Sequence, residues 1–215
     1  GLNLPACNLG MMLVGVHPYA LGVMIVPLEA EFGWSRSQIS AGPLVTSITA
    51  LLLAAFAGWI TDRIGPRKVA LVGVPLFGCA LAAIALAGPS IWSWLGLYAL
   101  LALALLCIYP SVWTAAIAVR FDRNRGLALA LALSGTGIAS ALVPYLAARL
   151  IEAYGWRGAY IGLGALSVLA VFPLVALFFA RETVPLAKRD VLEQRIPAGR
   201  LGEFKTRKFA CMALA

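Results

Sequence analysis

Charged residues are scarce in this 215-residue sequence. Only 12% of the residues are Asp, Glu, Lys or Arg, whereas 62% are apolar. Soluble domains carry roughly twice that share of charged residues, about a quarter of the chain. The shortage of charge therefore excludes an ordinary soluble domain and predicts an integral membrane protein, with the lipid bilayer as its main partner.

Histidine and cysteine are also rare, with one His and four Cys in the chain. All four cysteines fall within apolar runs, without the close pairing of zinc ligands, and nothing places two of them in an oxidising compartment. His17, the only His, precedes every candidate nucleophilic Ser, the reverse of the order in rhomboid-like intramembrane proteases. We therefore expect no metal, no cofactor and no enzymatic activity.

Six apolar runs are long enough to cross a bilayer as helices, each needing roughly 20 residues. They are Leu4–Val26, Ile39–Thr61, Val69–Gly88, Trp94–Val119, Gly126–Ala147 and Ala159–Ala180. This pattern predicts an all-α polytopic membrane protein with a six-transmembrane-helix bundle over residues 1–180. A central loop (181–208) and the truncated start of a seventh transmembrane helix (209–215) follow. The chain has no initiating Met, and we interpret it as a fragment.

The basic residues lie mostly on one side of the predicted membrane. The second loop, the fourth loop and the segment after residue 180 hold 14 of the 17 Lys and Arg residues. Cytoplasmic loops carry such an excess, so this side, the N-terminus and the central loop are predicted to be cytoplasmic in the inner or plasma membrane. The net charge of +8 is then a topology signal, and no nucleic-acid partner is expected.

Two loops on the opposite side share one pattern. Glu31-Phe-Gly33-Trp34-Ser35-Arg36 and Ala153-Tyr-Gly155-Trp156-Arg157 both read aromatic, Gly, Trp and then Arg. Glycine permits a sharp turn, and Trp is favoured at headgroup depth. Ser35 followed by Gln38 fits a capping box. We interpret these loops as interfacial anchors and caps, with an extracellular gate as the alternative.

The loop after the second run carries a spaced motif: Gly58-x-x-x-Asp62-Arg63-x-Gly65-x-Arg67-Lys68. It resembles the loop signature of the major facilitator superfamily, except that Pro66 stands where Arg is common. The resemblance implies twelve spans in two six-helix halves, with the substrate between the halves. It also implies that this motif forms a cytoplasmic gate, in which Asp62 pairs with basic groups of a neighbouring helix. By this resemblance the chain is the N-terminal half, and its C-terminal half is a missing partner.

A second motif precedes the fifth run. Phe121, Arg123, Arg125 and Gly135, with Leu-Ala and small residues between them, resemble the start of the fifth helix of monocarboxylate transporters. The stretch 27–39 resembles bacterial relatives that include oxalate/formate antiporters. Because the Gly-Pro motif of some antiporters is not clearly present, symport with a proton and exchange for a counter-anion both stay open.

Polar residues inside the first, fourth and fifth runs are candidates to line the substrate cavity, since such residues are costly in lipid. His17 is also a candidate to carry a proton. Packing between helices is the alternative for each of them. The candidates are Asn8, His17, Tyr19, Tyr98, Tyr109, Trp113, Ser134 and Thr136.

The resemblance implies a secondary active transporter of small organic anions, similar to monocarboxylate transporters, that works by alternating access. We expect the chain to be inactive alone, because the opposing wall of the cavity would be absent. Two alternatives stay open: a half-length transporter that works as a homodimer, and a transporter of a neutral or hydrophobic solute such as a drug or sugar.

Overall fold

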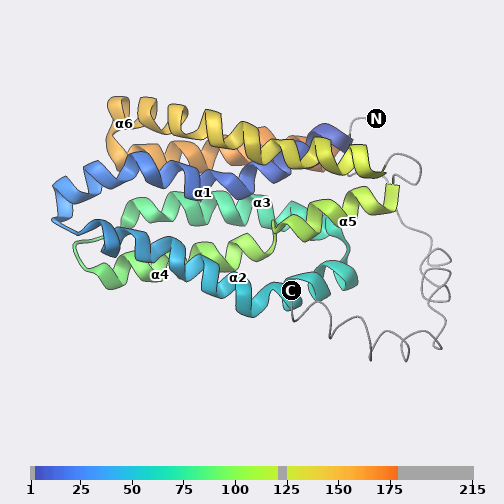
Figure 1. Ribbon diagram of the computed structural model, residues 1–215, viewed down its shortest axis with the longest axis horizontal. Helices are drawn as coiled ribbons and strands as arrows, with labels where there is room; N and C mark the ends of the chain where they lie inside the picture. Colours follow the sequence, from blue (N-terminus) through green and yellow to red (C-terminus); the bar gives the residue numbers. More distant parts are fainter. Residues whose placement is uncertain (1–2, 121–124, 179–215) are drawn as a thin grey trace, which may run out of the picture. The chain divides into compact units, whose positions relative to one another are not determined.

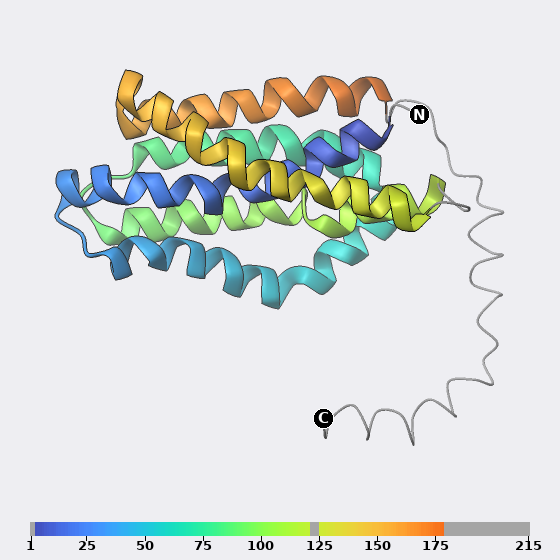
Figure 2. The same cartoon turned by 45° about the horizontal axis from the view of Figure 1, so that its top comes forward.

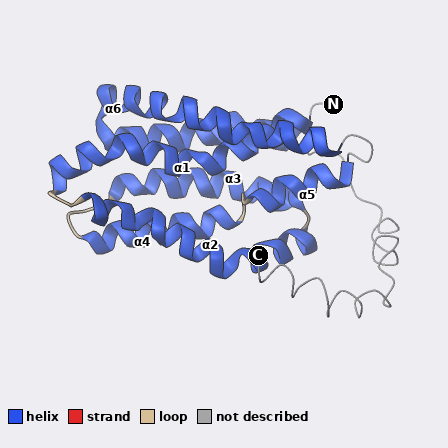
Figure 3. Ribbon diagram, in the orientation of Figure 1, coloured by secondary structure: helices blue, strands red, loops and turns tan. Residues whose placement is uncertain are grey.

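The computed structural model describes residues 3–120 and 125–178, and almost all of them are helical (Figure 3). The elements are α1 (Asn3–Phe32), α2 (Arg36–Ile64), α3 (Pro66–Ala83), η1 (Ile84–Leu86), α4 (Ile91–Leu106), α5 (Pro110–Arg120) and α6 (Arg125–Phe178). No strand occurs within these ranges. The prediction of an all-α fold is therefore confirmed for this part of the chain. The predicted central loop (181–208) and seventh-helix start (209–215) lie outside the described residues.

Five helical stretches are long and apolar enough to cross a membrane. The last of them, Gly126–Leu177 in α6, has 52 residues and would extend about 78 Å if straight, against a hydrocarbon core of about 30 Å. It is not straight, because Gly155 has a non-helical φ of 70° and ψ of 175°. The two arms of α6, residues 125–154 and 156–178, run back along each other (Figures 1 and 2). These arms are the fifth and sixth predicted spans, so the six-span bundle agrees with the structure.

The fourth span is not the continuous helix predicted over Trp94–Val119. Helix α4 ends at Leu106, and α5 begins at Pro110. Proline has no N–H to donate to the carbonyl four residues earlier, and it disfavours helical geometry in the residue before it. The N–H groups of Cys107 and Ile108 bond back three residues instead of four. A break therefore interrupts this span, and residues on its two sides no longer share one helical face.

Helix α6 packs against both α1 and α3, while α2 packs mainly against α4. Glycines allow the closest approaches. A Cβ added at Gly164 would lie 2.5 Å from the carbonyl oxygen of Gly78, and one at Gly135 would meet the carbonyl of Asn8. Small residues at such crossings let helix backbones approach, which is how helices associate when lipid supplies no hydrophobic drive between them.

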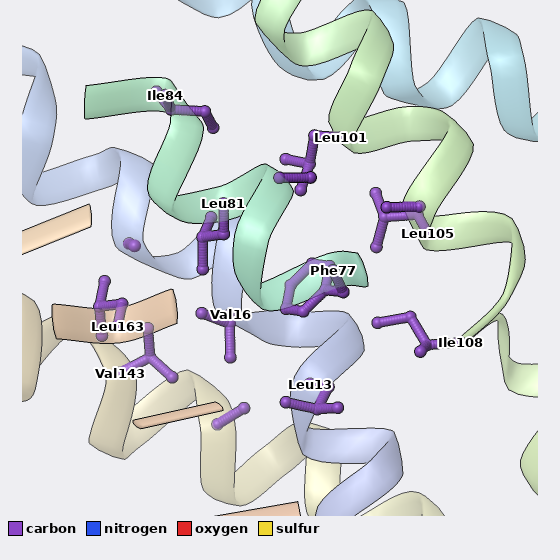
Figure 4. Close-up of a cluster of buried hydrophobic side chains, with 14 of the residues drawn as sticks. Leu13, Val16, Phe77, Leu81, Ile84, Leu101, Leu105, Ile108, Val143 and Leu163 are labelled. Atoms are coloured by element: carbon purple, nitrogen blue, oxygen red, sulfur yellow. The ribbon is translucent and has the colours of Figure 1, made fainter. Parts of the chain in front are cut away.

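Apolar side chains fill the space between these helices (Figure 4). Leu13 and Val16 of α1, Phe77 and Leu81 of α3, and Leu101 of α4 are all buried in one cluster. The cluster joins the first four spans and both arms of α6 into one packed unit.

The connections gather at two ends of the bundle (Figures 1 and 2). At one end, here called the Gly155 end, lie the α1–α2 connection, the η1–α4 connection and the break in α6. The other, here called the Gly65 end, holds the tight α2–α3 turn, and α5 ends and α6 begins there. The sequence-predicted cytoplasmic loops within the bundle are those of the Gly65 end.

Candidate functional site: a cavity between α1, α2 and α4

A cavity of about 290 Å³ lies between α1, α2 and the end of α4. Its polar lining consists of His17, Thr46, Ser47 and Tyr109, and the other lining residues are apolar. A mostly apolar pocket with a few polar groups is the usual form of a small-molecule site. The two predicted candidates that line this cavity are His17 and Tyr109.

His17 and Thr46 form a buried polar contact across α1 and α2. Both residues are less than a tenth exposed, and the imidazole Nε2 lies 3.4 Å from the Thr46 hydroxyl oxygen. The Thr46 hydroxyl itself donates to the Pro43 carbonyl oxygen at 2.7 Å. Because a hydroxyl has one hydrogen, and that of Thr46 is directed at Pro43, a hydrogen bond between Thr46 and His17 requires the tautomer in which Nε2 carries the hydrogen.

Thr46 and Ser47 were missed by sequence reasoning. Both lie in the uncharged run Ile39–Thr61, where adjacent hydroxyl residues beside Pro43 were the available signal. Pro43 leaves the Ile39 carbonyl without its helical donor. The Trp94 indole N–H supplies the replacement at 3.1 Å, so this proline also fixes α4 against α2.

Tyr98 and Trp113 are placed in the packed interior, away from this cavity. Both side chains are fully buried. The Tyr98 ring contacts Trp94 with centroids 4.8 Å apart. The Trp113 indole donates to the Ile108 carbonyl at 2.9 Å and fills the space that Gly10 leaves open. The break in the fourth span explains why Trp113 and Tyr109 do not line one common surface.

Asn8 and Ser134 meet at a second cavity of about 320 Å³ between α1 and the first arm of α6. The Asn8 amide donates to the Ser134 hydroxyl at 3.1 Å and to the Leu131 carbonyl at 2.7 Å. Tyr19 and Thr136 line neither cavity. The predicted candidates are therefore divided between two cavities, the packed interior and other positions on the helices.

The gate motif forms the turn between α2 and α3. Gly65 adopts a φ of 90° and donates its N–H to the Thr61 carbonyl at 2.9 Å. Pro66 occupies the first position of α3, where its missing N–H removes no helical bond. Glycine is required here because other residues rarely adopt this backbone conformation.

The charged residues of this motif differ in exposure. Asp62, Arg63 and Lys68 are exposed, and the Arg63 guanidinium lies 4.5 Å from the centre of the Trp59 ring. Arg67 is half-buried, and its Nε has no hydrogen-bond partner among the described residues. No helix within residues 3–120 or 125–178 approaches Gly58, since nothing lies within 4 Å of a Cβ built there. Gly58 therefore makes no close contact with another helix of the described residues.

The fifth-helix motif is described only in part. Phe121 and Arg123 lie outside the described residues, and Arg125 begins α6. Gly135 lies against the backbone of Asn8, as noted above. This position therefore has a packing role that its sequence pattern does not by itself reveal.

The repeated loop pattern places a glycine with a positive φ in each of two turns. Gly33 and Gly155 have φ values of 68° and 70°. The predicted Ser35–Gln38 capping box is present, and this prediction is confirmed. Phe32 stacks on Trp34 and packs edge-on against Trp156. The two repeated turns therefore contact each other directly at the Gly155 end.

Arg157 connects three parts of this end. Its guanidinium bonds the Glu31 carboxylate at 2.9 Å and donates to the carbonyls of Ala85 and Ala87, at the close of η1. The Trp156 indole also donates to Glu31. These contacts cap carbonyls at the end of η1 that lack helical donors, and they fix η1 to both repeated turns.

Within residues 3–120 and 125–178, no three His, Cys, Asp or Glu side chains come together as a metal site would require.

The sequence was compared with known proteins. It is 29% identical to the gallate transporter of Pseudomonas putida over 201 residues, which cover 92% of this chain and 43% of that protein. It is 33% identical to monocarboxylate transporter 11 of Mus musculus over 158 residues, covering 72% of this chain and 34% of the relative. It is 36% identical to multidrug resistance protein MdtG of Citrobacter koseri over 210 residues, covering 93% and 50%.

The chain thus spans between about a third and a half of the length of these relatives. The sequence profile described as Major Facilitator Superfamily matches residues 7–215, nearly the whole chain. Apolar helices of membrane-spanning length and this match together make it an integral membrane protein with a monocarboxylate-transporter-like sequence. The chain belongs to the major facilitator superfamily of transporters.

Proposed function

We propose that this chain is the N-terminal half of a secondary active transporter of small organic anions. The observation that carries the proposal is the cavity lined by His17, Thr46 and Tyr109, which lies inside a bundle of this superfamily. Relatives named for gallate and for monocarboxylates support an organic acid as the solute. Alternating access would require a C-terminal half that closes the opposite wall of the cavity.

In this proposal the Gly65 end faces the cytoplasm of a cell bounded by the inner or plasma membrane. The basic residues of the α2–α3 turn support this orientation, since positive charge is enriched in cytoplasmic loops. Asp62, Arg63 and Arg67 form the cytoplasmic gate with helices of the other half. The unpartnered Arg67 Nε and the open space beside Gly58 both leave room for such a helix.

Uptake of labelled organic acids by the full-length transporter tests the proposal. Cells that express it should accumulate a small carboxylate, such as lactate or 4-hydroxybenzoate, faster than cells with empty vector. Accumulation driven by an inward proton gradient, and lost in His17→Gln, would assign the proton to His17. Uptake of neither acid, with the protein present in the membrane, would contradict the organic-anion proposal.

Two observations favour a second candidate function, the transport of a neutral or hydrophobic solute. The similarity to a multidrug resistance protein is one, and the absence of Lys and Arg from the described lining of the cavity is the other. Uptake of a neutral solute without uptake of carboxylates would favour this candidate. Uptake by cells expressing the 215-residue chain alone would favour a half-length transporter that works as a homodimer.

The gate makes a separate prediction. Asp62→Asn in the full-length transporter should lower the maximal uptake rate at least several-fold and leave the solute affinity near that of the unchanged protein, because the gate acts on the conformational change. Uptake kinetics at matched expression measure both quantities. Asp190→Asn, outside the motif, is the control. An unchanged maximal rate in Asp62→Asn would exclude this role for Asp62.

A further inference from the structure

The two α2 hydroxyl groups in the α1–α2–α4 cavity, those of Thr46 and Ser47, have already used their hydrogens. Thr46 donates to the Pro43 carbonyl at 2.7 Å, and Ser47 donates to the same oxygen at 3.0 Å. Each hydroxyl has a single hydrogen and two lone pairs. What both residues can offer to a molecule in the cavity is therefore an acceptor of hydrogen bonds.

A third acceptor lies at the break in the fourth span. Leu106 lines the cavity, and Pro110, four residues later, has no N–H to donate to its carbonyl. No backbone donor in the break replaces it among the bonds of the described residues. Unwound backbone at membrane depth is tolerated where it lines a cavity, and there its carbonyls can bind a solute.

Donors are few on the same walls. The His17 Nε2 lies against the Thr46 hydroxyl, so a hydrogen on this nitrogen would already be used in that contact, and none of the described lining residues is Lys or Arg. Tyr109 is the remaining hydroxyl, and its single hydrogen can rotate. A bare carboxylate, which only accepts hydrogen bonds, is poorly matched to these walls, because its desolvation would not be offset.

We propose that this cavity is a subsite for a hydroxyl-bearing, largely apolar part of the solute, whose hydroxyl shares its single hydrogen between the Thr46 and Ser47 oxygens in a three-centre hydrogen bond. The apolar lining packs against the body of the solute, and any carboxylate is held elsewhere in the transporter. This inference rests on the proposed function only in placing a solute in the cavity. It adds a specificity: the site distinguishes a hydroxylated solute from its deoxy analogue.

The test compares two pairs of ligands that differ by one hydroxyl group. One pair is anionic, 4-hydroxybenzoate and benzoate, and the other is neutral, 4-hydroxybenzamide and benzamide. Binding to the purified full-length transporter is measured by calorimetry. We expect the hydroxylated member of a pair to bind about tenfold more tightly, the effect of one good hydrogen bond.

Three single variants and one double variant locate the effect. Thr46→Val keeps the shape of the side chain and removes its acceptor. Ser47→Ala also removes the acceptor, at an exposed position that tolerates the shorter side chain. Either change should reduce the preference, and the double variant should reduce it to about twofold or less. Thr49→Val, one turn along α2 and outside the cavity lining, is the matched control and should keep the full preference. If Thr46→Val does not fold, Ser47→Ala alone still decides the result.

The outcomes separate this inference from the proposed function. Equal binding of both members of both pairs overturns the inference and leaves organic-anion transport standing. A preference confined to the benzamides, with no carboxylate bound, supports the inference and contradicts the anion proposal. A preference that persists in both single variants, or no binding of any of the four ligands, overturns the inference.

Discussion

Arg157 shows how one side chain can organise an end of the bundle. Its planar guanidinium has several N–H groups in a fixed geometry, which suits it to bind a carboxylate and backbone carbonyls together. Here it contacts Glu31, Ala85 and Ala87 and also lies over the Trp156 ring at 4.4 Å. The exposed Arg149–Glu152 pair at the same end lacks this network, with side chains 64% and 68% exposed.

Arg157→Lys should therefore destabilise the protein, and Arg149→Lys should not. A lysine keeps the charge but cannot reach the same acceptors at once, so the free energy of unfolding should fall by about 1–3 kcal/mol. Exposed pairs contribute about 0–1 kcal/mol, which makes Arg149→Lys the control. Thermal unfolding in detergent measures both variants. Equal Tm values for them would show that the Arg157 network contributes no more than a surface pair.

At this scale the sequence predicts residues whose role follows from local spacing. The Ser35–Gln38 capping box depends on three residues of separation, and the structure contains it. Thr46 was missed because its role depends on where its hydroxyl hydrogen points and on a residue of another helix, His17. Tyr98 shows the opposite limit: a polar aromatic residue inside an apolar run is compatible with both a cavity and a core, and only the three-dimensional packing places it in the core.

Helix α6 shows what glycine does at the scale of an element. Gly164 on its second arm touches the Gly78 carbonyl of α3, whereas Gly137 on its first arm has no atom within 4 Å of a built Cβ. Glycine thus allows a close helix contact at position 164 and has open space beside it at position 137.

Gly164→Ala should separate α3 from α6 and destabilise the protein, by about 1–3 kcal/mol as for other overpacked sites. Gly137→Ala should be neutral or stabilising by up to about 1 kcal/mol, because alanine favours a helix more than glycine does. Thermal unfolding of the two variants under one condition compares them. A Gly164→Ala protein as stable as Gly137→Ala would contradict the close contact between α3 and α6.

The sequence predicts a membrane-spanning helix well where a long apolar run alone determines its position. Length and hydropathy place the spans, because each must satisfy its own backbone in lipid. The sequence failed at the break before Pro110, since six prolines lie inside other described helices without ending them: Pro18, Pro27, Pro43, Pro75, Pro144 and Pro173. Whether a proline breaks a span depends on which donors neighbouring helices supply, as Trp94 does for the Ile39 carbonyl.

At the scale of the whole molecule, the proposed orientation makes a direct prediction. In a variant without native cysteines, Ser37→Cys at the Gly155 end should react with a membrane-impermeant maleimide added to intact cells. Lys68→Cys at the Gly65 end should react only after the membrane is permeabilised. The reverse pattern would place the Gly65 end outside and contradict the cytoplasmic gate.

The Gly155 end also bears on the order in which the chain can fold. Glu31 lies 126 residues before Arg157 and 125 before Trp156, its two partners from the second turn. During synthesis the turn at Gly33 therefore leaves the ribosome long before these partners exist. Contacts between residues so distant in sequence form late. Until the hairpin around Gly155 has been inserted, the Glu31 carboxylate and the final carbonyls of η1 have only water and headgroups to bond. Completion of this hairpin is thus the step that supplies these partners, and a nascent chain halted before residue 157 lacks them.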